Sequence, residues 1–258
     1  MIKRPKLNIP IVGTIHDFNW KYFFGRQIFP LSFVTEMDGD ILDWLENSFT
    51  ISSSNDVVNE ANKLYPGLKR YPEVVHIAPV TFSENVTPEH AQKILDDLEI
   101  NYPYIIFPGN FYPHKNHFNL FAAFALLKKR EGFKSLKLIL TGMNSDQVPY
   151  AIAEKLGIQL VTINSPNKDF DIRGLGYQPN NVIEVLIKNA TLLVSPSIYE
   201  AICTPAMDAW FFGTPTAISD IPPFREHEAA WGIRSAYFDP TDIENIADTL
   251  EKYINNPE

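Results

Sequence analysis

The sequence predicts an α/β protein built on a parallel, doubly wound sheet, and three observations lead to that fold class. From about residue 102 onward, short apolar runs alternate regularly with segments of helical length. Repeated strand–helix units of this kind are typical of a parallel sheet with helices on both faces. Residues 191–194 read Thr-Leu-Leu-Val, a short apolar run that is typical of a strand buried on both faces. A hydrophobic content of 45% is ample for buried cores.

The second half is expected to form a Rossmann-like domain over residues 102–258. Helix boundaries carry the clearest local signals: Asn180 is a candidate cap, and Thr241 to Glu244 indicate a capping box before the last helix. The predicted strands are 104–107, 136–140, 158–163, 191–194, 215–219 and 236–238. The predicted helices are 118–130, 148–156, 182–189, 205–212, 224–230 and 241–254.

The first hundred residues are less regular and predict an incomplete α/β domain. They contain too few strand candidates for a full doubly wound sheet, and Ser54 is a candidate cap for one helix. We expect a partial domain over residues 1–80 and a connector over 81–101. The predicted strands here are 10–15, 50–52 and 74–79, and the predicted helices are 41–47, 56–64 and 88–98.

Charge, cysteine content and the start of the sequence limit the partners and the location that we expect for the protein. The formal net charge of −9 and a pI near 5.2 argue against nucleic acid or an anionic membrane as an electrostatic partner. The one cysteine, Cys203, excludes an intrachain disulfide and fits a reducing compartment. The apolar run near the start is broken by Pro10, so it predicts neither a signal peptide nor a membrane helix. The expected location is the cytoplasm.

The stretch SPSIYEAICTPAMDAWFFGTPTAISD is the strongest candidate site. It puts Glu200 on a loop directly after a predicted strand, where ligands of α/β sheets usually sit. A short helix follows, with Thr204 as N-cap and Pro205 first, and it stops at Gly213. Backbone N–H groups at such a helix start favour an anion. Asp208, expected in the first turn, either binds a ligand or simply suits the helix dipole, and local spacing leaves both readings open.

A second candidate site is FPGNFYPHKN, in which a strand runs through Gly109 into a loop and then a helix. Lys115 lies just before that helix, where a positive side chain can hold a diphosphate. The alternative is a solvated surface charge. His114 and His117 flank the lysine, but no cysteine or carboxylate pattern nearby supports a metal site.

With these segments in order, residues 105–251 resemble the donor-binding domain of family 4 glycosyltransferases, which have the two-domain GT-B fold. Four segments match in sequence: PGNFYPHKNHFNLFAAFALL, LKLILTG, the Glu-x7-Glu-like stretch above, and REHEAAWGIRSAYFDPTDIENIADTL. The resemblance before Ile105 is thinner. There, VGTIHDFNW looks like the strand and histidine that face the cleft, and ISSSNDVVNEANKLYP is similar to a later helical segment of the acceptor-side domain.

The resemblance implies roles for individual residues. Lys115 would neutralise the donor diphosphate, Glu200 would orient the transferred sugar, and His16 would lie near the sugar and the acceptor. Asp208 would hydrogen-bond the nucleotide ribose. The implied catalytic set is Glu200, Lys115 and His16. The implied donor-binding set is Gly109, Asn110, Lys115, Ile202, Cys203, Thr204 and Asp208.

The implied activity is that of a retaining hexosyltransferase, which moves a sugar from a nucleotide-diphosphate donor to a hydroxyl without a metal. The implied partners are the nucleotide sugar and a glycan or lipid-linked acceptor, in surface glycan or glycolipid synthesis. No nucleic acid or transmembrane segment is expected, whereas peripheral contact with the inner face of a membrane fits the acceptor.

Departures from the family pattern keep two alternatives open. Asn110 stands where the family usually has a second positive charge, an arginine, and Asp208 is one methylene shorter than the usual glutamate. Ala201, Ile202 and Cys203 replace Gly-Phe-Gly, and the opening glycine-rich segment of the acceptor-side domain is not found. A catalytically weak nucleotide-sugar-binding module that needs a partner chain is therefore one alternative, and an epimerase of similar fold is the other.

Overall fold

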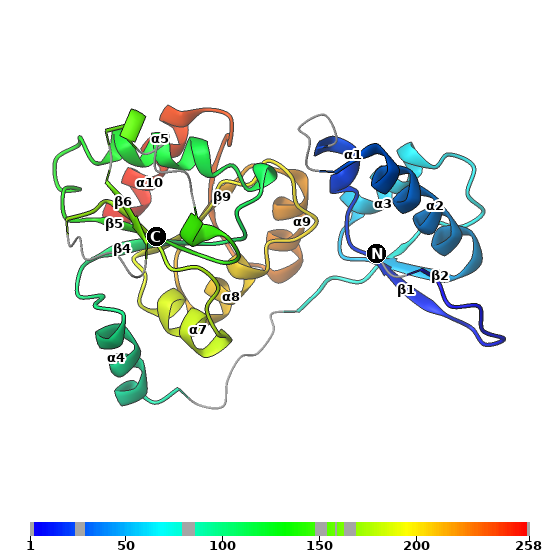
Figure 1. Ribbon diagram of the computed structural model, residues 1–258, viewed down its shortest axis with the longest axis horizontal. Helices are drawn as coiled ribbons and strands as arrows, with labels where there is room; N and C mark the ends of the chain where they lie inside the picture. Colours follow the sequence, from blue (N-terminus) through cyan, green and yellow to red (C-terminus); the bar gives the residue numbers. More distant parts are fainter. Residues whose placement is uncertain are drawn as a thin grey trace. The chain divides into compact units, whose positions relative to one another are not determined.

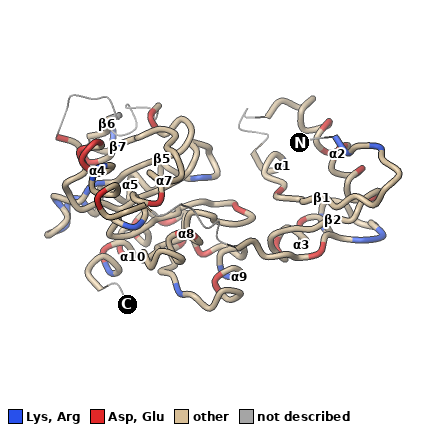
Figure 2. Tube along the Cα trace, turned by 90° about the horizontal axis from the view of Figure 1, so that it is seen from below, with Lys and Arg blue, Asp and Glu red and all other residues tan. Residues whose placement is uncertain are grey.

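A computed structural model describes residues 3–23, 29–78, 86–147, 154–157, 159–162 and 169–256. The chain forms two compact units (Figure 1). The N-terminal unit comprises Met1–Ala78 together with Tyr199–Ile202 and Ile221–Gly232, and the C-terminal unit comprises the rest. Figure 2 shows acidic and basic residues interspersed along the described trace of each unit.

The C-terminal unit is built on one parallel sheet of seven strands among the described residues, in the order β10-β9-β8-β4-β5-β7-β6. Its central strands β4, β5 and β8 are buried along nearly their whole length, as the apolar runs predict. The strands are β4 (Tyr104–Pro108), β5 (Lys137–Thr141), β6 (Leu160–Thr162), β7 (Ile172–Gly174), β8 (Leu192–Ser195), β9 (Thr216–Ser219) and β10 (Ala236–Phe238).

Helices cover both faces of this sheet. Figure 1 shows α5 (His117–Leu127) and α10 (Ile243–Asn255) on one face and α7 (Asn180–Lys188) and α8 (Thr204–Phe212) on the other. The pair α5 and α10 closes a core of large side chains that includes Phe121, Phe124 and Leu250. A further helix, α4 (Pro88–Asp97), precedes the first strand and packs near α7. The predicted Rossmann-like architecture is therefore confirmed.

Most of the predicted elements of this unit are present, with one strand missed. The prediction contains no strand at β7, which joins the sheet between β5 and β6. The predicted helix 148–156 falls largely on residues 148–153, which lie outside the described residues, and the ends of the predicted strand 158–163 do so as well.

Three predicted helix caps are wrong by one residue. The helix after residue 200 begins at Thr204 itself, with Cys203 as N-cap, and Asn180 is the first residue of α7 rather than its cap. Thr241 does not cap α10, because its amide and hydroxyl both bond the carboxylate of Asp239. Asp242 caps that helix instead. The predicted stop at Gly213 is confirmed by a left-handed φ of 76°.

The N-terminal unit holds a parallel sheet in the order β1-β2-β3, formed by β1 (Val12–Ile15), β2 (Phe49–Ser52) and β3 (Glu73–Val74). Its helices are α1 (Asn19–Phe23), α2 (Leu31–Asn47), α3 (Asn55–Leu64) and α9 (Pro222–Trp231). Ser54 caps α3 as predicted, since its hydroxyl accepts the amide of Val57 at 3.4 Å. The core includes Ile15, Phe18, Trp20, Ile41 and Ala201.

Two predicted elements of this unit differ in length. The predicted helix 41–47 is the end of α2, which starts ten residues earlier at Leu31 because Met37, Ile41 and Leu45 continue one buried face at a spacing of four. The predicted strand 74–79 shrinks to β3, and residue 79 lies outside the described residues. The predicted border at 80/81 also falls there. Segments 199–202 and 221–232, expected in the second domain, belong to the N-terminal unit.

Candidate functional site

The strand order of the C-terminal unit defines a switch point between β4 and β8. Strands β5, β7 and β6 lie in that spatial order on one side of β4, and β8, β9 and β10 lie on the other side. Strands β4 and β8 run parallel, with Ile105 opposite Leu192. In open α/β sheets, ligands bind in the crevice beyond the carboxyl ends of the two strands at which the order reverses. The two loops that leave this point are the candidate segments of the sequence.

The loop after β4 is locked by backbone contacts with the loop after β5. The amide of Gly109 donates to the carbonyl of Thr141, and the amide of Phe111 donates to that of Met143, each at 2.9 Å. Gly142 has a φ of 109°, and a Cβ there would lie 2.7 Å from the carbonyl carbon of Gly109. Only glycine fits this close approach.

Asn110, one of the implied donor-binding residues, has a structural task in this loop. Its side-chain oxygen accepts the amide of Met143 at 2.8 Å. The position at which the family usually carries an arginine thus stabilises the neighbouring loop and supplies no positive charge. The sequence could not reveal this contact, because the identity of residue 110 says nothing about its distant partner Met143.

Lys115 ends a short 3-10 turn, η2 (Pro113–Lys115), and is half-buried. Its Cδ lies 3.9 Å from the place that a Cβ on Gly109 would occupy, so the stem of the lysine passes over that glycine. Two hydrogen bonds then join this loop to the one after β8. The carbonyl of His114 accepts the amide of Ile198 at 2.8 Å, and the side chain of Asn116 donates to the carbonyl of Pro196 at 2.9 Å.

These bonds bring Lys115 to the same edge of the sheet as the segment leading into α8. Asn116 adopts the left-handed conformation, with φ 57°, and also donates to the carbonyl of Pro240 after β10. It therefore ties three carboxyl-end loops together. Asparagine tolerates a left-handed φ better than most residues, and this tolerance is the sequence signal for such a role at Asn116.

His117 is a core residue. Its ring lies 4.7 Å from that of Phe107 and 4.8 Å from that of Phe111, centroid to centroid. Burial lowers the pKa of His117 to about 3, so the imidazole stays neutral. Within the described ranges, no three His, Cys, Asp or Glu side chains gather as a metal site would need.

The loop after β8 carries Glu200, Ile202 and Cys203 into α8. Glu200 and Ile202 are half-buried, and both belong to the segment 199–202 that packs with the N-terminal unit. Cys203 is buried and forms no disulfide, and a buried cysteine of this kind packs as a small apolar side chain. The N-cap residue Cys203 makes no side-chain cap hydrogen bond to α8, and Thr204 at the first position of α8 is exposed. Backbone N–H groups at such a helix start suit an anionic ligand.

Asp208 is the most unusual group near this edge. It is the fifth residue of α8, so it lies beyond the first turn, and the dipole explanation for it is wrong. Its exposure is 6%, and within the described part of the chain its carboxylate has no hydrogen-bond or ion-pair partner. Burial raises the pKa of Asp208 to about 7. By contrast, Oε1 of the buried Glu184 is paired with the ammonium of Lys188 at 2.5 Å, although its Oε2 has no partner among the described residues.

A buried carboxylate without a partner costs folding free energy, because burial disfavours its charged form. Such a group is typical of ligand sites, where a bound molecule supplies the missing donors. Two sugar hydroxyls would satisfy both carboxylate oxygens of Asp208.

His16 follows β1 in the N-terminal unit and is exposed. It lines a cavity of about 570 Å³ together with Trp20, Met37 and Trp44. The indole nitrogen of Trp20 is buried there without a partner among the described residues. The cavity runs along β1, which is an edge strand of its sheet.

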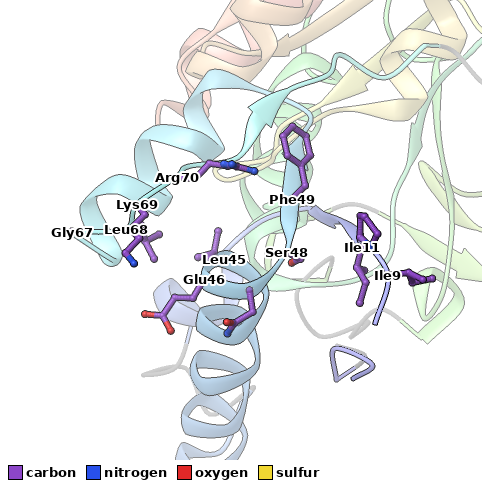
Figure 3. A pocket seen from close by; sticks show the side chains of 12 residues that line it. Ile9, Ile11, Leu45, Glu46, Ser48, Phe49, Gly67, Leu68, Lys69 and Arg70 are labelled. Carbon is purple, nitrogen blue, oxygen red and sulfur yellow. The ribbon is translucent and has the colours of Figure 1, made fainter. Parts of the chain in front are cut away.

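A larger cavity, of about 800 Å³, lies at the opposite end of the same sheet (Figure 3). Ile11 precedes β1 and Phe49 begins β2, so the cavity adjoins the amino ends of these strands, and Arg70 lies 5.4 Å from the ring of Phe49. His16 follows the carboxyl end of β1, so this cavity is no part of the candidate site.

Comparison with known proteins identifies the family. Residues 91–258 match the family model described as "Glycosyl transferases group 1". The chain belongs to the group 1 glycosyl transferases. This confirms the resemblance on which the site residues were assigned, although their individual roles stay predictions.

This group 1 glycosyl transferase is 25% identical over 259 residues to mannosylfructose-phosphate synthase of Agrobacterium fabrum, in a match that covers 95% of the chain. The chain spans 56% of the length of that relative. Among solved structures it is similar to WaaG, a glycosyltransferase involved in lipopolysaccharide biosynthesis, with a TM-score of 0.68 and 15% identity over 96% of this chain and 67% of that one.

It is also similar to HepE of Anabaena in complex with UDP and glucose, with a TM-score of 0.67 and 16% identity over 96% of this chain and 63% of that one. At such identities the likeness concerns the fold, and it confirms the GT-B assignment. Among the described helices of the transferase, none combines the length and the apolar character needed to cross a membrane.

Proposed function

We propose that this group 1 glycosyl transferase binds a nucleotide-diphosphate sugar at the β4–β8 switch point and transfers the sugar to a hydroxyl acceptor with retention. One observation carries the proposal: the hydrogen bond from the amide of Ile198 to the carbonyl of His114 holds the Lys115 loop beside the segment that enters α8. A cation and a helix N-terminus at one sheet edge suit a diphosphate.

The chemistry assigns a task to each group. As the bond between the anomeric carbon and the diphosphate oxygen breaks, negative charge grows on the diphosphate. Lys115 and the first amides of α8 stabilise that charge. Asp208 accepts hydrogen bonds from the ribose hydroxyls. Glu200 orients the sugar, and His16 serves the sugar and the acceptor.

In this proposal the charge on the diphosphate is met by these groups of the chain and not by a metal ion. Turnover that is unchanged by EDTA would support this, and turnover that EDTA abolishes and Mg²⁺ restores would contradict it. We also propose an acceptor in surface glycan or glycolipid synthesis, with peripheral membrane contact. HepE, which is named with UDP and glucose, is consistent with a nucleotide-sugar donor.

A catalytically weak binding module that needs a partner chain is the second candidate, because one observation favours it. The side chain of Asn110 is bonded to the Met143 amide, so this position does not supply the second cation that the family usually has there. An arginine clamp contributes strongly when charge builds on a leaving diphosphate.

A thermal-shift panel with UDP-glucose, UDP-galactose, GDP-mannose, UDP and GDP tests the shared part of both candidates. A ligand that binds only the folded state raises the melting temperature. A stabilising nucleotide sugar that is also hydrolysed or transferred supports the transferase. Stabilisation without turnover, with all acceptors tried, supports the module. Free isomerised sugar without an acceptor would indicate an epimerase, and no shift with any of these ligands would refute the proposed donor site.

A further inference from the structure

Tyr199 directly precedes Glu200, and its hydroxyl makes two hydrogen bonds within the N-terminal unit. It accepts the backbone amide of Phe18 at 3.0 Å and donates to the carboxylate of Glu60 on α3 at 2.6 Å. Phe18 lies two residues after His16 at the end of β1. One phenol oxygen thus links the chain beside Glu200 to the chain beside His16.

The residue on the other side of Glu200 is anchored as well. Ala201 is buried in the same core as Ile15 and Phe18. The ring of Tyr199 packs against that of Tyr22, with 5.2 Å between the centroids. Glu200 is therefore held between two anchored neighbours, and the Tyr199 hydroxyl bonds directly to the turn that carries His16.

We infer that Tyr199 is a positioning residue that sets the spacing between Glu200 and His16, the two groups expected at the transferred sugar. This inference rests on the proposed function. Both hydrogen bonds require a neutral phenol, which donates and accepts at once. Burial and the neighbouring Glu60 raise the pKa of Tyr199, which keeps the phenol protonated at all working pH values.

Glu60 supports this arrangement from α3. Its carboxylate also accepts a hydrogen bond from the hydroxyl of Tyr22 on α1. Removing the Tyr22 hydroxyl would take one hydrogen bond from Glu60 and leave both contacts of Tyr199 in place. Tyr22→Phe is therefore the matched control for Tyr199→Phe, since each loses one phenol oxygen next to the same carboxylate.

The test compares wild type, Tyr199→Phe and Tyr22→Phe in the full chain by calorimetric titration. The probes are the best nucleotide sugar of the thermal-shift panel and its nucleoside diphosphate. We expect Tyr199→Phe to weaken nucleotide-sugar binding about tenfold or more, because small misplacements of site groups cost up to about 100-fold. Diphosphate affinity should stay within about twofold. Where turnover is measurable, Tyr199→Phe should lower kcat by a larger factor than the control Tyr22→Phe does.

Hydrogen exchange gives a readout that does not depend on activity. The Phe18 amide should exchange faster in Tyr199→Phe than in wild type and remain protected in Tyr22→Phe. A parallel loss of sugar-nucleotide and diphosphate affinity, or no loss in either, would overturn the positioning role while leaving the donor site intact. Wild-type protein that binds none of the probes would overturn the proposed function, and this inference with it.

Discussion

The Asp208→Asn substitution removes a buried charge that nothing in the described part of the chain neutralises. The pKa of Asp208 rises from an ordinary 3.8 to about 7 because the carboxyl is buried. A pKa unit corresponds to about 1.4 kcal/mol, so a shift of about three units sets a ceiling of roughly 4 kcal/mol. Relaxation and water penetration reduce such costs, and we expect a gain of about 1–3 kcal/mol for the amide at pH 8.

The sign of the pH dependence follows from linkage. Between about pH 4 and pH 7 the folded protein binds more protons at Asp208 than the unfolded chain does. The contribution of this group to stability is therefore most favourable at low pH, falls as the pH rises through this window, and levels off above about 7. The Asn variant should lack this component.

Urea unfolding of wild type and Asp208→Asn at pH 5 and pH 8 measures both effects. Glu184→Gln is the contrasting control, because that buried carboxylate is paired with Lys188 and its loss should destabilise the protein. An Asn variant that is less stable than wild type at pH 8 would refute the reasoning, since it would mean that Asp208 has a partner.

The same variant should bind nucleotides more weakly. A carboxylate that accepts two ribose hydroxyls contributes about 1.5–3 kcal/mol through charged hydrogen bonds, so affinity should fall roughly 10- to 100-fold. Binding should favour the ionised form, so wild-type affinity should rise between pH 6 and pH 8. A residue that lowers stability but supports binding is the expected signature of a functional group. Unchanged affinity in titration calorimetry would remove Asp208 from the site.

Three further predictions concern the loops of the switch point. Lys115→Ala should weaken nucleoside-diphosphate affinity by about 1.5–3 kcal/mol and reduce its salt dependence, and equal affinities in calorimetry would place the lysine outside the site. Glu200→Gln should lower transfer or donor hydrolysis far more than nucleotide binding; a parallel loss of both would make Glu200 a structural support. Gly142→Ala should lower the unfolding free energy by more than about 2 kcal/mol, since its Cβ would meet the Gly109 backbone. A melting temperature near that of wild type would show that the loop adapts.

The sequence predicted the architecture wherever local signals and tertiary structure agree. Gly213 ends α8 because glycine adopts its left-handed φ without strain, and residues 236–238 form β10 as expected. Strand β7 was missed because it has only three residues and a charged one, Arg173, at its centre. The guanidinium of Arg173 is nevertheless buried, bonded to the carbonyl of Leu98 and 5.9 Å from the ring of Phe170. The sequence around Arg173 does not show that Leu98 and Phe170 would contact its guanidinium.

The candidate site shows the same division. Lys115 and the loop before α8 were found from residue types that follow predicted strands, and strand order alone then brought their loops to one edge. The tasks of Asn110 and Tyr199 were not predictable, because their partners lie 33 and 181 residues away in the sequence. The isolation of Asp208 likewise depends on packing around α8 and on no local motif.

The most direct test of the donor site is a titration of isotopically labelled protein with UDP and GDP, followed by backbone amide NMR. We expect one of the two nucleotides to shift the amide signals of Gly109, Lys115, Ile198, Thr204 and Asp208, while the amide signals at the amino ends of β1 and β2 stay unchanged. Shifts confined to other residues, or none with either nucleotide at millimolar concentration, would contradict a diphosphate site between β4 and β8.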